Sequence, residues 1–254
     1  MFLSYNGTMT ILNVIATSHG TDSASGREAI ALIREQIQRL LAQRTDGVEY
    51  RVHAAYVDVE SPSVDDAAAS LPKDEPCVIV PILLSTGFHT QVDLRRAARN
   101  SGIERISIGE SLGPDARLAA LTRTRLEEAG WAPGETPVVQ GAAGSSRADG
   151  RADMSRAAEL LAEELTAPVH HGFIAAIDPK FHEVVAEHKP EFAATYLLAE
   201  GFFAGKMRCD AASTGVPVKV AAPLVNAQGG ASAAVVAECF IDRMDAAIAQ
   251  LDAA

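Results

Sequence analysis

Residues 77–84 read CVIVPILL, an apolar run without a single polar side chain. Strands in the middle of a parallel sheet are covered on both faces, so they show this continuous pattern rather than an alternation of apolar and polar residues. Working outward from this run, we predict further strands at 11–17, 52–59 and 105–108, and helices at 29–41, 64–71, 91–100 and 114–129. Strands and helices alternate along the chain, which predicts an α/β fold with a mainly parallel sheet flanked by helices.

The stretch GWAPGE at 130–135 is predicted to link two domains, because Gly and Pro interrupt helix and strand alike. The same alternation resumes after it. Strands are predicted at 137–142, 169–177, 192–198 and 218–221, and helices at 154–165 and 232–251. We therefore predict an N-terminal domain over 10–130 and a C-terminal domain over 136–254, each a similar α/β unit.

Three short segments of the first half recur in order in the second half, which predicts an internal duplication. They pair SHGT at 18–21 with AAGS at 142–145, YVD at 56–58 with FIA at 173–175, and LLSTGFH at 83–89 with LLAEGFF at 197–203. In this alignment His19 faces Ala143, Asp58 faces Ala175, and His89 faces Phe203. Residues that served only the shared fold would have no reason to lose their polarity together. The first domain is therefore predicted to carry the functional site, and the second to be a degenerate structural copy.

His19, Asp58 and His89 each lie at or just past the end of a predicted strand. In open parallel sheets, ligands bind beyond the carboxyl ends of the strands, so these three side chains are expected to converge. Two neutral imidazoles and a carboxylate suit a borderline divalent metal such as Fe²⁺, Co²⁺, Ni²⁺ or Zn²⁺. Two plainer alternatives stay open at this point. Either histidine could be a hydrogen-bonded structural residue, and Asp58 could cap a turn.

Other histidines point less clearly to a site. His170 and His171 are neighbours in a predicted strand, so their side chains should lie on opposite faces of the sheet. Surface exposure or core packing is predicted for this pair rather than a shared metal ion. His182 and His188 lie six residues apart, a spacing that does not place them on one helix face, and both are predicted to be solvated.

The overall charge excludes some classes of partner. The chain has 33 acidic and 22 basic residues and a formal net charge of −11, which argues against nucleic acid and against an anionic membrane surface. No window approaches the roughly 20 apolar residues of a membrane span, and the N-terminal MFLSYNGTMT lacks the basic start of a signal peptide. We therefore expect a soluble cytoplasmic protein, in which Cys77, Cys209 and Cys239 are reduced and mostly buried thiols.

The same residues carry a resemblance to a known family. ATSHGT at 16–21, YVD at 56–58 with SPSV at 61–64, and VPILLSTGFH at 80–89 resemble the class II chelatases. These include the sirohydrochlorin ferrochelatases and the anaerobic cobaltochelatases of siroheme and cobalamin biosynthesis. The last segment is similar to the VPxLLSxGxH signature of that family, and the resemblance covers the chain after residue 10. It implies a long, two-domain member whose two halves face a central cleft.

The resemblance also implies a function. It implies a lyase-class metal chelatase that inserts a divalent metal, Fe²⁺, Co²⁺ or Ni²⁺, into the tetrapyrrole sirohydrochlorin, with the metal as a substrate and no organic cofactor. His19 and His89 would bind the metal and act as general bases, with Asp58 orienting an imidazole or relaying a proton. The family often carries Glu where this chain has Asp58, so this carboxylate is shorter by one methylene.

Three alternative functions remain to be compared with metal insertion. A metal or tetrapyrrole carrier without turnover would use the same histidines. A histidine phosphatase would need an Arg just before His19 to hold phosphate, and Ser18 stands there instead. A nucleotide-binding site at 141–150 is disfavoured because that stretch has no P-loop lysine.

Sirohydrochlorin carries eight carboxylates, so an acidic protein that binds it must offer local donors. The candidates are the cations Arg27, Arg95, Arg96, Lys206 and Arg208, or else the backbone amides of the Gly-rich turns. Because the chain already contains both halves of the duplicated fold, we expect it to act as a monomer.

Overall fold

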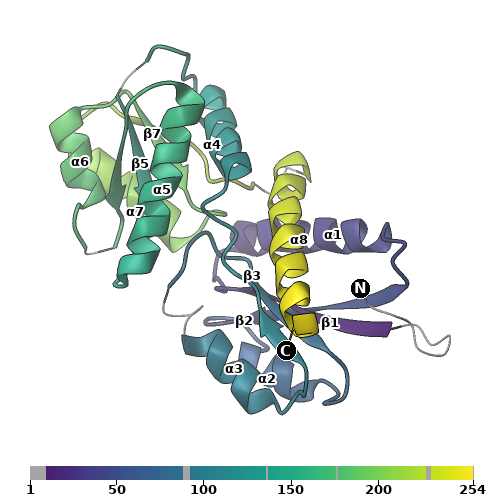
Figure 1. Ribbon diagram of the computed structural model, residues 1–254. Helices are drawn as coiled ribbons and strands as arrows, with labels where there is room; N and C mark the ends of the chain where they lie inside the picture. The colour runs from purple at the N-terminus through teal and green to yellow at the C-terminus, as the bar shows by residue number, and fades with distance from the viewer. Residues whose placement is uncertain (1–9, 88–91, 136, 176, 227–229, 254) are drawn as a thin grey trace.

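The structure, a computed structural model, describes residues 10–87, 92–135, 137–175, 177–226 and 230–253 (Figure 1). Within these residues the strands form two four-stranded parallel sheets. The first sheet has the order β2-β1-β3-β4, with β1 (Thr10–Ser18), β2 (Val48–Tyr56), β3 (Cys77–Pro81) and β4 (Ile106–Ile108). The second has the order β6-β5-β7-β8, with β5 (Val138–Ala142), β6 (Val169–Phe173), β7 (Phe192–Tyr196) and β8 (Lys219–Val220). The predicted α/β fold with two similar halves is confirmed, and β3 is buried at every position, as its apolar sequence predicts.

The strands end earlier than the apolar sequence predicts. β2 ends at Tyr56 rather than at 59, β3 at Pro81 rather than at 84, and β6 at Phe173 rather than at 177. Beyond β2 the chain soon turns, because Glu60 N donates a hydrogen bond to Asp58 O at 2.7 Å and Val59 has a φ of 65°. Apolar residues continue into these loops, so composition alone overestimates the length of the strands.

The helices mostly follow the predicted alternation. They are α1 (Ala24–Ala42), α2 (Val64–Ser70), α3 (Leu94–Ser101), α4 (Ala116–Glu128), α5 (Ala148–Leu165), α6 (Phe181–His188), α7 (Phe202–Ser213) and α8 (Gly230–Ala253). α1 begins ahead of its predicted start because the side chain of Ser23 accepts a hydrogen bond from Gly26 N at 3.2 Å and caps the first turn. α7 is not predicted by the sequence, since its apolar residues do not gather on one face. In the described part of the chain, no helix is both long enough and apolar enough to cross a membrane.

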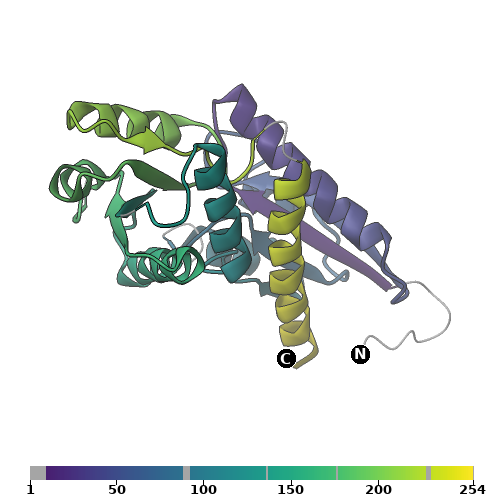
Figure 2. The same ribbon diagram turned by 90° about the horizontal axis from the view of Figure 1, so that it is seen from above.

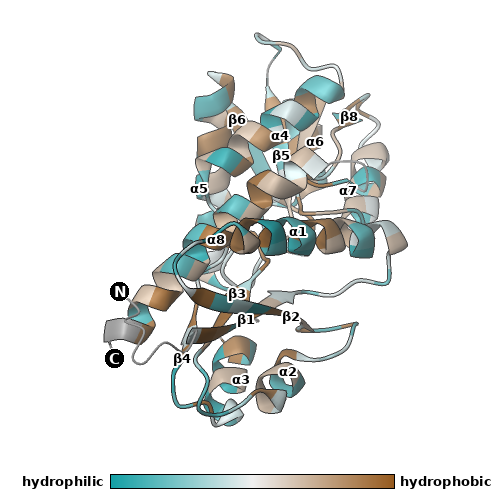
Figure 3. Ribbon diagram, turned by 90° about the vertical axis from the view of Figure 1, so that its right-hand side faces the viewer, coloured by the Kyte–Doolittle hydropathy of each residue, from teal (hydrophilic) through white to brown (hydrophobic). Residues whose placement is uncertain are grey.

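Helices cover both faces of each sheet (Figure 3). On the first sheet, α2 and α3 pack against one face, where Ile15, Ile79 and Leu94 are fully buried. α1 and α8 pack against the opposite face. The second sheet is covered by α6 and α7 on one face and by α4 and α5 on the other. The carboxyl ends of the strands therefore remain the part of each sheet where a site can form.

The last helix of each half covers the sheet of the other half. α4 follows β4 in the chain but packs against α5 and β7, whereas the C-terminal α8 packs against α1, β3 and β4 (Figure 1, Figure 2). An arginine anchors each helix. Arg125 of α4 donates Nε and Nη2 to Leu224 O at 3.0 and 2.9 Å, and Arg243 of α8 donates to Ser111 O and Leu112 O at 3.0 and 3.1 Å. The two halves are thus interlocked in space, although the segment 130–135 separates them along the chain.

The internal duplication is visible in matched backbone hydrogen bonds. The bond from Asp58 N to His19 O in the first half matches the bond from Ala175 N to Ala143 O in the second, both at 2.9 Å. In the same way, the bond from Leu112 N to Leu83 O at 2.8 Å matches the bond from Leu224 N to Leu197 O at 2.9 Å. The glycine that follows β1 and the one that follows β5 adopt the same left-handed conformation, with a φ of 92° at Gly20 and 99° at Gly144. The sequence alignment of the two halves is therefore also a structural one.

Candidate functional site

His19 lies one residue past the carboxyl end of β1. Ser18, the last residue of the strand, is 2% exposed, whereas the His19 side chain is exposed. The imidazole Nδ1 lies 3.4 Å from Gly20 O, a long contact that leaves the ring at the rim of the sheet. The fold thus places an accessible imidazole at the end of a rigid, buried strand.

Gly20 fixes the backbone that carries His19. Its φ of 92° lies in the left-handed region, which glycine adopts without steric cost. Its Cα also packs directly against the carbonyl oxygen of Asp58, and a Cβ there would overlap that oxygen. Together with the bond from Asp58 N to His19 O, this close approach joins the loop after β1 to the turn after β2.

Asp58 is adjacent to His19 through the backbone, and its side chain forms a local bond. Its Oδ1 accepts a hydrogen bond from Val59 N at 2.8 Å, and the residue is exposed. The carboxylate therefore caps its own turn, as the plainer sequence alternative proposed. A catalytic role for this carboxylate stays a prediction.

Glu60 is a polar residue of this loop that the sequence analysis missed. Its Oε1 accepts a hydrogen bond from Thr21 N at 2.9 Å, so a second carboxylate supports the segment just after His19. The equivalent position in the second half is Ile177, since Ile177 N donates to Ala175 O as Glu60 N donates to Asp58 O. The alignment of the two halves could have revealed Glu60, because it shows the same loss of polarity there.

His89, the second predicted metal ligand, lies outside the described residues. The segment that leads toward it leaves the sheet beside His19, because Thr17 of β1 pairs with Pro81 of β3 and Ile82 N donates to Thr17 O at 2.7 Å. Farther along, Thr86 N donates to Asp153 Oδ2 of the second half at 2.7 Å. The convergence of His19 with His89 stays a prediction.

The two halves touch beside His19 through a reciprocal contact. A Cβ on Gly26, near the start of α1, would overlap the carbonyl oxygen of Glu200 in the second half. A Cβ on Gly150, near the start of α5, would overlap the carbonyl oxygen of Thr86 in the first half. These two glycines are equivalent in the duplication, as are Thr86 and Glu200. Each half therefore presses the loop after its third strand onto the first helix of the other.

The structure separates the five predicted cations into two groups. Arg96, Lys206 and Arg208 are paired with carboxylates, at 2.8 Å from Asp65, 2.7 Å from Asp210 and 2.7 Å from Glu200. Arg27 donates instead to the backbone oxygen of Thr21 at 3.0 Å. Among the described residues, neither Arg27 nor Arg95 forms an ion pair. These two guanidinium groups are the better placed of the five to receive a ligand carboxylate.

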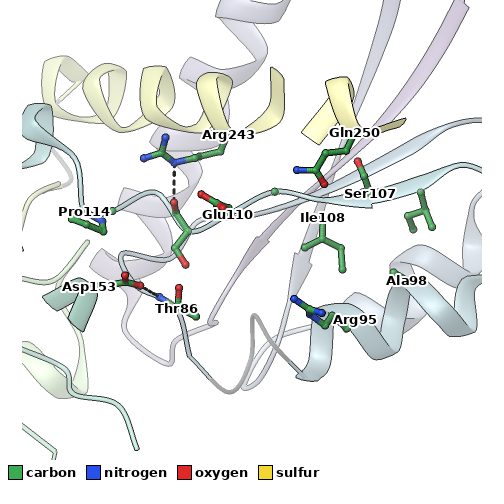
Figure 4. Close-up of a pocket in the computed structure, with 14 residues that line it drawn as sticks. Thr86, Arg95, Ala98, Ser107, Ile108, Glu110, Pro114, Asp153, Arg243 and Gln250 are labelled. Carbon is green, nitrogen blue, oxygen red and sulfur yellow. Dashed lines mark hydrogen bonds between the residues drawn. The ribbon is translucent and has the colours of Figure 1, made fainter. Parts of the chain in front are cut away.

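A cavity of about 710 Å³ adjoins the loop after β3, on the β4 side of the sheet (Figure 4). Its lining includes Thr86, Arg95, Asp153 and Arg243, which come from both halves of the chain. The hydroxyl of Ser111, a residue 5% exposed that also lines it, is buried without a hydrogen-bond partner. The cavity is polar, and Arg95 gives it a guanidinium.

The histidines of the second half form local contacts. His170 stacks on His188, with ring centroids 3.5 Å apart, so His188 is not simply solvated as predicted. His171 Nε2 lies 3.1 Å from Ser155 Oγ, and burial lowers the pKa of this imidazole. Among the described residues, no three His, Cys, Asp or Glu side chains gather in a way that could hold a metal ion.

Comparison with known proteins identifies the family of the chain. A family model described as CbiX matches residues 13–129, the segment that contains His19 and Asp58. The chain is also 30% identical, over 95 residues, to a sirohydrochlorin cobaltochelatase of Sulfurisphaera tokodaii, covering 37% of this chain and 76% of that protein. The chain belongs to the class II chelatase family. The resemblance seen in the sequence is thereby confirmed, and this family member is a metal chelatase.

Solved structures extend the likeness of this class II chelatase over both halves. SirB from Bacillus subtilis with Fe³⁺ superposes with a TM-score of 0.75 at 21% identity, covering 96% of this chain and 98% of that one. CbiX, described as the terminal enzyme of siroheme biosynthesis in denitrifying bacteria, superposes with a TM-score of 0.68 at 20% identity, covering 91% and 98%. The two-half fold of this chelatase is therefore that of proteins of similar length.

Proposed function

We propose that this chelatase inserts Fe²⁺ or Co²⁺ into sirohydrochlorin, as a lyase-class enzyme of siroheme or cobalamin biosynthesis. One observation carries the proposal. The half that matches the family presents an exposed imidazole, His19, at the carboxyl end of its β1 strand, and the equivalent position of the second half is Ala143. The cobaltochelatase relative and the iron-bound and cobalt-bound structures of SirB support these two metals.

Insertion exchanges two pyrrole N–H protons for one divalent metal ion, so the net charge of the macrocycle is unchanged. An unprotonated imidazole has a lone pair that can bind the incoming ion or accept one of these protons. We assign both tasks to His19 and His89 together. Asp58 acts as a positioning residue in this proposal, because its backbone N–H binds His19 O and its carboxylate holds the adjoining turn.

The substrate carboxylates need cations, and we propose Arg27 and Arg95. Arg27 is tied to the backbone of Thr21, two residues beyond His19, and Arg95 lines the cavity beside the loop after β3. Neither guanidinium is neutralised by a carboxylate among the described residues. A charge of opposite sign close to the site offsets the repulsion expected from a net charge of −11.

We further propose that the chain acts as a cytoplasmic monomer and that its two domains divide near 130–136. The duplication supports a monomer, since one chain supplies both sheets. Light scattering during gel filtration should give a mass near 26.7 kDa, and a mass of twice that value would refute the monomer.

A spectroscopic insertion assay with sirohydrochlorin and Co²⁺ or Fe²⁺ tests the function. We expect turnover by the wild-type chain and its loss in His19→Ala and in His89→Ala, with far-UV circular dichroism unchanged. Full activity in both variants would refute the site. Binding of Co²⁺ and sirohydrochlorin without acceleration of insertion would refute the enzyme in favour of a carrier.

A further inference from the structure

Large apolar side chains that are exposed to solvent lie at one kind of position in this protein. Among the described residues they are Val59, Val92, Phe202 and Phe203, with 51%, 36%, 77% and 37% of their surface exposed. Each lies on a segment that follows the carboxyl end of a strand: β2, β3 or β7. Exposed apolar groups that gather in this way mark a binding surface more often than scattered ones do.

Val59 is held in a conformation that its side chain disfavours. Its φ of 65° is a genuine outlier for a β-branched residue. Two hydrogen bonds impose it: Val59 N donates to Asp58 Oδ1 at 2.8 Å, and Glu60 N donates to Asp58 O at 2.7 Å. Strained residues of this kind persist mainly at functional sites, and this one presents an isopropyl group to solvent instead of burying it.

Phe202 presents a phenyl ring from the other half of the chain. It follows Gly201 at the start of α7, and a Cβ on Gly201 would lie 3.3 Å from Thr21 Oγ1. The Phe202 ring contacts Phe203 edge to face, with centroids 5.5 Å apart and an interplanar angle of 79°. An aromatic neighbour in this geometry restricts the orientation of the exposed ring.

The loop that carries His19 adjoins the segments of both apolar groups. On one side the His19 carbonyl accepts the bond from Asp58 N, and Val59 is the next residue. On the other side the Thr21 side chain lies close to Gly201, and Phe202 is the next residue. The segments that carry Val59 and Phe202 therefore both border the loop that carries His19.

We propose that Val59, Phe202 and Phe203 form an apolar wall that binds the face of the tetrapyrrole and positions its centre over His19. This inference rests on the proposed function. A tetrapyrrole with carboxylate side chains has an apolar face and an anionic rim, and the chain offers a matching cation, because Arg27 is bound to the backbone of Thr21, two residues beyond His19. The second half of the chain thus contributes substrate-positioning residues at the place where it has lost the metal ligand.

Phe202 gives the sharpest test, because a side chain 77% exposed can be changed without disturbing the core. We expect Phe202→Ala to raise both the Kd for metal-free sirohydrochlorin, measured by absorbance titration, and the KM about tenfold. The Kd for Co²⁺ alone should change less than twofold, whereas kcat should fall, because the macrocycle is no longer held with its centre over His19. Phe202→Trp should restore binding because it keeps a ring to stack, whereas Phe202→Leu should stay weak. Val59→Ala should weaken sirohydrochlorin binding in the same direction.

The outcomes separate this inference from the proposed function. If the wild-type chain inserts metal and Phe202→Ala binds sirohydrochlorin as tightly as the wild type, the apolar wall is refuted and the function stands. If the wild-type chain does not bind sirohydrochlorin, both are refuted. A wild-type dimer that Phe202→Ala dissociates, with sirohydrochlorin binding unchanged, would assign the surface to a second copy of the chain and overturn the wall.

Discussion

Replacing Gly20 by Ala should impair catalysis far more than it impairs folding. Gly20 has a φ of 92°, and its Cα packs against the Asp58 carbonyl oxygen. The left-handed conformation costs a non-glycine residue roughly 1–2 kcal/mol. The overlap with a backbone oxygen cannot be relieved by a rotamer change, so the loop that carries His19 must move away from the turn after β2.

The two effects have different magnitudes. A loss of roughly 1–2 kcal/mol lowers the Tm of a chain of this size by about 2–8 °C. Displacement of a catalytic group by about 1 Å can reduce the rate about 100-fold. We therefore expect Gly20→Ala to be folded at 25 °C and to show kcat/KM for metal insertion lowered about 100-fold.

Gly144→Ala provides a matched control, because Gly144 is the equivalent residue of the second half and has a φ of 99°. A Cβ there would meet side-chain carbons of Ile177, Ala175 and Phe173 at 3.1–3.2 Å, not a backbone oxygen. The control should lose a similar amount of stability, measured by urea unfolding, and keep its insertion rate. Equal activity losses in the two variants, or a Gly20→Ala enzyme within threefold of wild type, would refute the reasoning.

Three further predictions concern stability and reactivity. Arg125→Met should cost about 2–3 kcal/mol of unfolding free energy, since it removes two charge-assisted bonds to Leu224 O. Arg123→Met, which breaks only exposed ion pairs of the same helix, should destabilise the chain much less, and equal losses in urea unfolding would contradict the anchoring role. At pH 8 a thiol reagent should label Cys209 alone in the folded chain, because Cys77 and Cys239 are buried and burial raises their pKa values to about 12. Rapid labelling of a second thiol would contradict this prediction. Burial lowers the pKa of His53, so this histidine contributes stability at pH values above about 6.5, the pKa in the unfolded chain, and the contribution is lost as the pH falls below that value. The drop in Tm from pH 7.5 to 5.5 should therefore be smaller in His53→Gln, and an unchanged drop would exclude His53 as a cause.

The order of the elements could be predicted because it depends on local patterns. The apolar run of β3 is buried on both faces, and such burial leaves a continuous apolar sequence. The ends of the strands could not be predicted in the same way. Val57 and Val59 look like strand residues, but the turn that contains them is set by hydrogen bonds to the loop after β1, which lies about 40 residues earlier in the chain.

The sequence could also indicate which half carries the site. The contrast between His19 and Ala143 is a comparison within one chain, and it needs no coordinates. The sequence could not indicate which side chains form ion pairs. Arg95 and Arg96 are neighbours in sequence, yet Arg96 is bound by Asp65 and Asp93 while Arg95 faces a cavity. Only the fold brings Asp65 of α2 to α3, so the sequence could not rank the two cations.

The exchange of α4 and α8 could not be read from the sequence either. Both helices have apolar faces that would fit either sheet, so their apolar residues alone do not select one. The arginine anchors do select, because Arg125 and Arg243 each require a carbonyl of the opposite half. Arginine is rarely buried without a dedicated partner, but the burial of Arg125 can be seen only in the structure.

This exchange of helices limits how the two halves can move. In a two-lobed protein joined by a hinge, one lobe can rotate as a rigid body and close over a ligand. Here α4 packs on the second sheet and α8 packs on the first, so the segment 130–135 lies inside the second lobe. The chain crosses between the lobes twice, between β4 and α4 and again between β8 and α8. Two crossings of the chain, not a single flexible segment, therefore connect the lobe that carries His19 to the lobe that carries Phe202. Any closure over a ligand must bend both crossings together, which restricts the directions in which one lobe can rotate against the other.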